Sequence, residues 1–379
     1  MKLLYATLFV LSAARASAQF AIGTIETTIY DAVRDRDVPC LIHYPAETAG
    51  NDVPVSDGQF PVLVVGHGFV MAVEAYTYLW EHYVPLGYIV TLPDTETGFA
   101  PDHATFGGDI AFLANYLIQA DADAGSPFFG HVAPDAALIG HSMGGGAAFL
   151  GAANNTAIRT VVGLAPAETS PSAVQAAGAV VVPALVFAGS EDCVTPIEAH
   201  AGPISAAVTS DCNVFVNING GGHCYFGDNS FTCSFGELTC GPDLTISREQ
   251  QHDVVTDVLD DWLRFHLLGQ SAALTDLFDS LATSTRYVSQ STCISTNVTG
   301  PSEAIAEPTV VQEGNALRVR GVQAGDQLFL RDPMGRAVRD FRSAGAEVVL
   351  PLSDSMIGAH VIEVVSGARR WARLIAIMR

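Results

Sequence analysis

The pentapeptide Gly140-His141-Ser142-Met143-Gly144 constrains the fold of this 379-residue chain more than any other segment. An apolar run, residues 136–139, precedes it, and small or apolar residues 145–150 follow it. This order predicts a strand, a sharp turn and a helix, because flanking glycines let the backbone turn tightly and the helix pack against the strand. A serine at such a turn is exposed at the carboxyl edge of a sheet. Ser142 is therefore a candidate nucleophile.

Further apolar runs place this turn in a larger sheet. Five more segments have the composition of buried strands: residues 61–65, 88–92, 160–164, 181–187 and 214–218. Helical patterns occur between or after them, at residues 105–119, 143–153, 196–208 and 247–268. Apolar strands that alternate with helices are typical of a parallel sheet covered on both faces. The predicted fold class is α/β, with a doubly wound, mostly parallel sheet.

The N-terminus has the pattern of a secretory signal peptide, which we place at residues 1–18. Lys2 supplies the charged start, residues 3–11 are apolar, and Ala16-Ser17-Ala18 is a small-residue cleavage site. The apolar stretch is shorter than the roughly 18 residues that a membrane-spanning helix needs. We therefore expect a secreted protein with no stable membrane insertion.

The mature chain is long enough for two domains. The polar stretch 287–308 contains Gly300-Pro301 and Pro308 and is typical of a linker. Short strands then follow at residues 316–320, 327–330, 347–350 and 360–364, with a turn signal at 332–335. We expect a catalytic domain at 19–293, a linker at 294–308 and a small β-rich domain at 309–379.

The charge of the chain excludes some partners. The net charge is −22, and residues 19–300 contain 31 acidic but only 6 basic side chains. Residues 301–379 are balanced, with 9 acidic side chains and 10 arginines. Such a negative balance argues against nucleic acid or an anionic membrane as a partner and fits a protein kept soluble in high salt. We expect a monomer.

Seven cysteines in an exported chain favour disulfides over metal ligation. They are Cys40, Cys193, Cys212, Cys224, Cys233, Cys240 and Cys293. Their spacing lacks a C-x-x-C pair, so no zinc site is predicted. The odd count leaves one thiol over, and Cys40 in an apolar strand is the best candidate. Cys193 has two candidate partners, Cys224 and Cys212, and Cys233 and Cys240 are available to staple the loop 224–242.

Acidic and histidine residues follow two of the predicted strands. Glu191 and Asp192 come after the strand 181–187, and His223 comes after the strand 214–218. Serine, then an acid, then histidine is the chain order of the α/β-hydrolase catalytic triad. Adjacent side chains at a strand end point in opposite directions, so only one acid faces the histidine. Asp192 is favoured over Glu191 because its shorter side chain holds the imidazole with less freedom.

An ester-cleaving serine also needs donors for the oxyanion. One is the backbone N–H that follows the nucleophile, that of Met143. The glycine-rich loop 66–70 comes after the strand 61–65 and offers the N–H of Phe69, whose ring would border the acyl pocket. The glycines of this loop also suit a simple turn.

These segments resemble a known family. Residues 140–146, 152–155 and 217–223 are similar to the corresponding motifs of bacterial cutinases and polyethylene terephthalate (PET) hydrolases, and the resemblance covers about residues 38–293. It implies an α/β-hydrolase fold without a cofactor. It also implies a nucleophile, an acid, a base and an oxyanion pair, which are Ser142, Asp192, His223, and Phe69 with Met143.

The resemblance is weaker for the substrate-binding residues. His200 matches a position beside the family's substrate cleft, whereas Ala167 stands where the family usually has a tryptophan. The loop 224–242 is longer than in the family and contains four aromatic residues, which form either a replacement aromatic wall, a partial lid or a cluster that packs only the loop. The predicted substrate-binding set is Phe69, Met143, Ala167, Val194, His200, Tyr225 and Phe226.

The C-terminal domain is similar to the type A sorting domain of the type IX secretion system. The matching segments are residues 327–336, 357–361 and 374–377. This resemblance implies the type IX machinery as a partner and a location outside the cell or on its surface. A carbohydrate- or surface-binding β-sandwich is the main alternative, although Trp371 is the only tryptophan of the domain.

Together these features predict a secreted serine carboxylic ester hydrolase that works through an acyl-enzyme. Its substrate class is an ester or a polyester such as PET. A lipase or small-ester esterase without polymer activity is the first alternative. A hydrolase-fold binding protein without catalysis is the second, and the complete set of Ser142, Asp192 and His223 argues against it.

Overall fold

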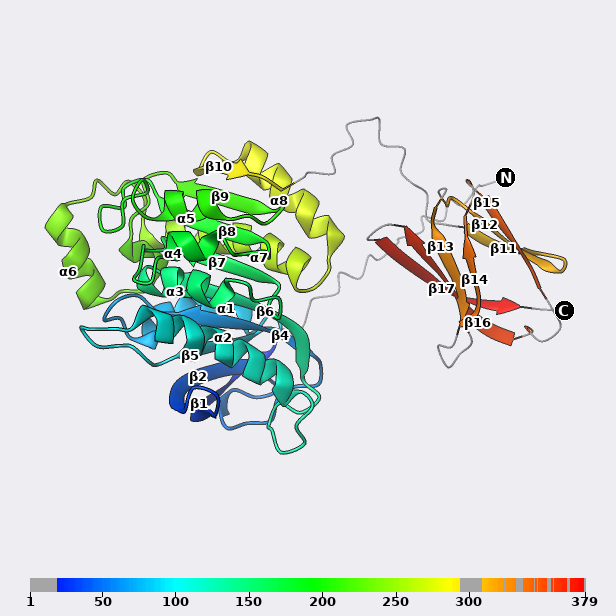
Figure 1. Cartoon of the computed structure of the whole chain (residues 1–379), viewed down its shortest axis with the longest axis horizontal. Helices are drawn as coiled ribbons and strands as arrows, with labels where there is room; N and C mark the ends of the chain where they lie inside the picture. The colour runs from blue at the N-terminus through cyan, green and yellow to red at the C-terminus, as the bar shows by residue number, and fades with distance from the viewer. Residues whose placement is uncertain are drawn as a thin grey trace, which may run out of the picture. The chain divides into compact units, whose positions relative to one another are not determined.

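The computed structural model describes residues 19–293 and 309–377, except 323–324, 332–336, 344, 346, 353–355, 357 and 367–368. The predicted signal peptide, the linker 294–308 and the turn at 332–335 lie outside the described residues. The chain divides into two compact units, residues 1–295 and 296–379 (Figure 1). Each unit has its own hydrophobic core and is described by itself.

The larger unit is built on one ten-stranded sheet with the order β10-β9-β8-β7-β6-β4-β5-β2-β1-β3. Strands β4 to β9 run parallel to one another, so the predicted mostly parallel sheet is confirmed. The strands are β1 (Ala21–Asp31), β2 (Arg36–Ala46), β3 (Gly50–Asn51), β4 (Phe60–Gly66), β5 (Ile89–Pro93), β6 (Val132–His141), β7 (Thr160–Leu164), β8 (Ala184–Gly189), β9 (Asn213–Ile218) and β10 (Tyr287–Ser291).

Helices cover both faces of this sheet (Figure 1). They are α1 (Thr77–Tyr83), α2 (His103–Ala120), α3 (Met143–Ala152), α4 (Ala173–Ala177), α5 (Ala201–Ala207), α6 (Phe231–Cys240), α7 (Arg248–His266) and α8 (Ser271–Thr283). Phe106 of α2 and Phe149 of α3 are buried on one face, and Trp262 of α7 is buried on the other. Burial on both faces explains why the central strands are continuously apolar. Among the described helices, none is both long and apolar enough to cross a membrane.

Three parts of this unit differ from the sequence prediction. The eleven-residue strand β1, which pairs antiparallel with β2, was not predicted, because it mixes exposed polar and partly buried apolar residues. The polar stretch that begins at residue 287 is not all linker, since β10 pairs antiparallel with β9 and buries Tyr287. The predicted helix 196–208 is helical only over α5.

The described part of the smaller unit is built from β-strands. They are β11 (Thr309–Glu313), β12 (Ala316–Arg320), β13 (Gln327–Arg331), β14 (Ala337–Arg342), β15 (Glu347–Pro351), β16 (Gly358–Ser366) and β17 (Arg369–Ile377). They form two antiparallel sheets, β11-β12-β15 and β14-β13-β16-β17. Leu317, Leu328 and Ile362 are in its core. The predicted small all-β region is therefore confirmed.

Six cysteines form three disulfides, Cys193–Cys240, Cys212–Cys293 and Cys224–Cys233. Both candidate partners of Cys193 were wrong, because α6 brings Cys240 to it and the end of β10 brings Cys293 to Cys212. The prediction that Cys40 is free and buried is confirmed. Burial raises the pKa of the Cys40 thiol to about 12, so it remains a thiol at neutral pH.

Candidate active site

Ser142 occupies the sharp turn between β6 and α3. Its backbone has φ +55° and ψ −120°, a conformation that non-glycine residues rarely adopt. Its N–H donates to the carbonyl of Leu164 (3.0 Å), and its carbonyl accepts from the N–H groups of Ala167 (2.8 Å) and Gly146 (3.1 Å). A strained residue that its surroundings hold this firmly is typical of a functional position.

Glycines let three backbone segments meet around this turn. A Cβ atom on Gly140 would lie 2.1 Å from the carbonyl oxygen of Gly144. A Cβ atom on Gly144 would lie 2.3 Å from the carbonyl oxygen of Gly66, at the end of β4. Neither position therefore tolerates a side chain without backbone movement. The glycines fix the distance between the nucleophile turn and the loop that contains Phe69.

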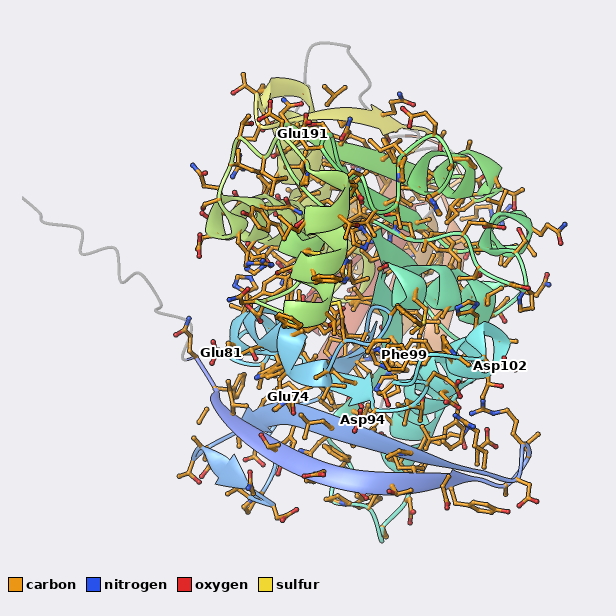
Figure 2. All side chains as sticks on the ribbon, turned by 90° about the vertical axis from the view of Figure 1, so that its left-hand side faces the viewer. Glu74, Glu81, Asp94, Phe99, Asp102 and Glu191 are labelled. Carbon is orange, nitrogen blue, oxygen red and sulfur yellow. A yellow bond between two sulfur atoms is a disulfide. The ribbon has the colours of Figure 1, made fainter. Side chains whose placement is uncertain are left out.

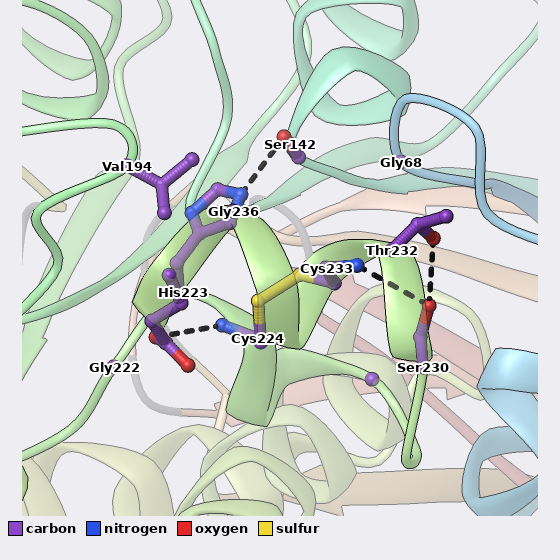
Figure 3. Close-up of a disulfide and its surroundings, with 12 residues drawn as sticks. Gly68, Ser142, Val194, Gly222, His223, Cys224, Ser230, Thr232, Cys233 and Gly236 are labelled. Atoms are coloured by element: carbon purple, nitrogen blue, oxygen red, sulfur yellow. Dashed lines mark hydrogen bonds between the residues drawn. A yellow bond between two sulfur atoms is a disulfide. The ribbon is translucent and has the colours of Figure 1, made fainter. Parts of the chain in front are cut away.

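Asp192 and His223 reach Ser142 from the ends of β8 and β9. The Nε2 atom of His223 lies 2.9 Å from Oγ of Ser142 (Figure 3), and its Nδ1 atom lies 2.8 Å from Oδ2 of Asp192. All three side chains are buried. The neighbouring Glu191 is partly exposed, and its carboxylate accepts a hydrogen bond from Ser190 instead. The structure therefore brings together the three residues that the sequence singled out and places Glu191 outside the group.

Thr195 completes the environment of the carboxylate. Oδ1 of Asp192 accepts hydrogen bonds from the N–H groups of Val194 (2.9 Å) and Thr195 (2.8 Å). The Thr195 hydroxyl donates to Oδ2 of Asp192 (2.8 Å) and lies 2.9 Å from Nδ1 of His223. These hydrogen bonds fix the orientation of the Asp192 carboxylate toward His223. Thr195 was not among the predicted site residues, although an aspartate followed by threonine three residues later is a signal for such a turn.

A buried hydrogen-bond chain connects three loops of the site. The N–H of Gly68 donates to the Tyr76 hydroxyl (2.7 Å), which lies 2.9 Å from Nδ1 of His141. Nε2 of His141 lies 3.1 Å from the backbone carbonyl of His223. Since a carbonyl only accepts, Nε2 holds the proton and Nδ1 accepts from Tyr76. Burial, and then the nearby His223, hold the pKa of His141 well below its ordinary value, which keeps the ring neutral.

The two predicted oxyanion donors are backbone N–H groups, one in the loop after β4 and one on the residue that follows Ser142. The N–H of Gly68 is occupied by Tyr76, so the N–H of Phe69 is the next available donor of that loop. Among the described residues the structure gives it no hydrogen-bond partner. Met143 is the first residue of α3, where N–H groups lack partners within the helix. The Phe69 ring is exposed and makes an edge contact with Phe99, which the sequence analysis did not identify.

The structure places the predicted substrate-binding residues in three kinds of environment: exposed, hydrogen-bonded within a loop, or fully buried. Ala167 and Val194 are at least partly exposed, and Figure 3 shows Val194 beside His223. Nδ1 of His200 accepts a hydrogen bond from the N–H of Glu168 (2.9 Å), and burial lowers the pKa of His200, so the ring orients this loop as a neutral acceptor. Phe226 is fully buried against His141 and is removed from the predicted substrate-binding set.

Tyr225 lies under a partly buried arginine. The guanidinium of Arg248 is 4.5 Å from the centre of the Tyr225 ring, and its Nη1 atom donates to the carbonyl groups of Cys224 and Gly227. Arg248 is the first residue of α7, so this helix holds the loop that follows His223. The proposed contact of Tyr225 with substrate stays a prediction. The role of Arg248 was not visible in the sequence, because 24 residues separate it from Cys224.

Two disulfides connect helix α6 to the loops that contain Asp192 and His223. Cys240 bonds to Cys193, the residue after Asp192, and Cys233 bonds to Cys224, the residue after His223 (Figure 3). The buried carboxylate of Glu237, also on α6, accepts a hydrogen bond from the N–H of Cys224 (3.2 Å). The direct Cys193–Cys224 bridge considered from the sequence is thus replaced by two bridges to one helix.

Comparison with known proteins gives two matches. A family model described as PETase, PET hydrolase-like, matches residues 15–236, a range that contains Ser142, Asp192 and His223. A bis(hydroxyethyl) terephthalate hydrolase of Streptomyces coelicolor is 26% identical over 184 residues, which is 48% of this chain and 54% of the relative. The match therefore spans about half the length of that relative.

Proposed function

The chain belongs to the PET hydrolase-like family, and from this membership and the site geometry we propose that it is a secreted serine carboxylic ester hydrolase. The hydrogen-bonded series Ser142–His223–Asp192 is the observation that carries the proposal. A neutral imidazole with its Nδ1 proton directed at a carboxylate has a free Nε2 lone pair facing the serine hydroxyl. This is the arrangement that a general base needs.

The proposed reaction has two stages. His223 takes the Ser142 proton while Oγ attacks the ester carbonyl, and the N–H groups of Phe69 and Met143 stabilise the oxyanion. His223 then protonates the leaving alcohol, and an acyl-enzyme remains on Ser142. A water molecule, deprotonated by His223, releases the acid. Each oxyanion donor typically contributes about 10²–10³-fold to the rate. Ionised Asp192 stabilises the imidazolium in both stages.

We propose a polyester such as PET as the substrate, in line with the family. A lipase or small-ester esterase is the second candidate, and a specific observation favours it. Ala167 stands at the position where the family usually has a tryptophan, so a stacking platform worth about 1 kcal/mol is missing there. The buried, fully connected triad supports catalysis over a role as a binding protein.

Neighbouring acidic residues offer a matched test of the catalytic assignment. Ser142→Ala and Asp192→Asn are expected to lower kcat on p-nitrophenyl butyrate by at least about 10³-fold. Glu191→Gln, one residue away, is expected to change kcat less than twofold. A panel of tributyrin, bis(hydroxyethyl) terephthalate, an aliphatic polyester and amorphous PET then separates the substrate candidates. Turnover that survives in Ser142→Ala would overturn the assignment.

For the C-terminal unit we propose the role of a type A sorting domain recognised by the type IX secretion machinery. Its two antiparallel sheets and separate core support a module that does not take part in catalysis. Deletion of residues 309–379 is expected to leave kcat within about twofold and to retain the protein inside the producing cell, measured by activity in the culture medium and in cell fractions. Loss of kcat in the purified, folded truncation would contradict this role.

A further inference from the structure

Helix α6 exposes an apolar stripe. Phe231, Phe235 and Leu238 are 85%, 61% and 76% exposed, and their i, i+4, i+7 spacing places them on one face of the helix. The Phe231 and Phe235 rings are stacked, with their centres 6.3 Å apart. The opposite face holds Cys233, Cys240 and the buried carboxylate of Glu237. An ordinary surface helix has the reverse arrangement, with apolar residues inward and charges outward.

Covalent bonds and a hydrogen bond fix the orientation of α6, so its apolar face stays exposed. Two disulfides, Cys193–Cys240 and Cys224–Cys233, attach α6 to the rest of the unit. The Thr232 hydroxyl adds a hydrogen bond to the carbonyl of Val70 (2.9 Å). A contiguous apolar surface that a protein keeps exposed usually marks a binding site.

The Phe231 end of the stripe adjoins the loop after β4, because Phe231, Thr232 and Val70 line the same surface pocket. Thr232 contacts Val70, which follows the oxyanion residue Phe69, and Cys233 is bonded to the neighbour of His223. Figure 3 shows Cys233 of α6 bonded to Cys224, the residue after His223. A second exposed aromatic pair, Phe69 with Phe99, borders the same site, and Figure 2 shows Phe99 on the face that α6 occupies.

The charge around the stripe limits its partner. No residue on the exposed side of α6 is charged, since Glu237 points inward. Figure 2 shows acidic residues on the same face of the molecule, with Glu191 above α6 and Glu74, Glu81, Asp94 and Asp102 below it. An anionic lipid surface would be repelled by these residues. A neutral, apolar surface would meet the aromatic stripe without this repulsion.

We propose that the α6 stripe, together with Phe69 and Phe99, is a docking surface for a solid, uncharged polyester and holds the enzyme with Ser142 over the polymer chains. This docking role rests on the proposed ester hydrolase function. A soluble ester diffuses to Ser142 by itself and does not need the stripe. A solid substrate does not diffuse, so its turnover depends on adsorption of the enzyme.

Adsorption is measured on the full-length Ser142→Ala protein, so that no substrate is consumed. Serine replacements at Phe231, Phe235 and Leu238 are expected to weaken its adsorption to amorphous PET particles at least tenfold. The control pair Val33→Ser and Phe129→Ser removes exposed apolar side chains in other loops and is expected to leave adsorption unchanged. Circular dichroism of each variant, including the single replacement Phe231→Ser, shows whether a loss of adsorption comes from a folding defect. The double variant Phe231→Leu with Phe235→Leu keeps the surface apolar and is expected to retain adsorption.

Active enzyme with the same replacements at residues 231, 235 and 238 is expected to keep kcat/KM on p-nitrophenyl butyrate within twofold and to lose polymer turnover by the factor lost in adsorption. Unchanged adsorption of the triple variant would overturn the docking role. So would tighter binding to phosphatidylcholine vesicles than to PET, or a dimer in sedimentation that the triple variant abolishes. If Ser142→Ala adsorbs but active enzyme cleaves no ester, the proposed function fails and the docking surface stands.

Discussion

The two halves of the candidate site are held in different ways. Ser142 follows β6, which lies inside the sheet between β4 and β7, and close backbone packing at Gly140 and Gly144 fixes its turn. Asp192 and His223 follow β8 and β9, nearer the edge of the sheet, where two disulfides to α6 fix their loops. A loop in the middle of a sheet has neighbours on every side. A loop near the edge lacks them, and here covalent bonds replace the missing packing.

The largest effect is expected from a methyl group in the nucleophile half. Gly144→Ala forces a Cβ atom against the Gly66 carbonyl, so the turn or the oxyanion loop must move. We expect kcat/KM on p-nitrophenyl butyrate to fall at least about 10³-fold and the free energy of unfolding to fall by about 3 kcal/mol. Gly236→Ala is the control, because a Cβ atom there meets nothing within 4 Å. Full activity in Gly144→Ala would contradict the claim that close backbone packing fixes the Ser142 turn.

A smaller effect on activity is expected from breaking a disulfide in the acid–base half. Cys193→Ser with Cys240→Ser removes a cross-link over 47 residues, and the free energy of unfolding should fall by about 4 kcal/mol. Because Cys193 follows Asp192, kcat should also fall about tenfold at a temperature where the variant is folded. Cys212→Ser with Cys293→Ser opens a bridge that is not attached to the acid or base loop. It should cost similar stability and leave kcat unchanged; equal kcat in both variants would remove the distinction between the halves.

The same difference explains what could be predicted from the sequence. Ser142, Asp192 and His223 each follow an apolar strand, so local patterns and chain order were enough to find them. The contacts of Tyr76 with His141 and of Arg248 with Cys224 join segments 65 and 24 residues apart and have no local pattern. The cysteine pairing failed for a similar reason, because it depends on where α6 lies. Strands β1 and β10 were missed because strands at the side of a sheet keep polar residues.

The acidic residues above and below α6 would act differently on the proposed polyester substrate and on its product. An intact polyester is uncharged, so Glu74 and Asp94 exert no net repulsion on it. The proposed hydrolysis converts each ester into an alcohol and a carboxylate, and the new chain end is then repelled by this face. Departure of the cut end is thereby favoured over its return, and molar salt would weaken the preference by screening. Electrostatic repulsion therefore favours release of the product and not binding of the substrate, because the repelled carboxylate exists only after the ester bond is broken.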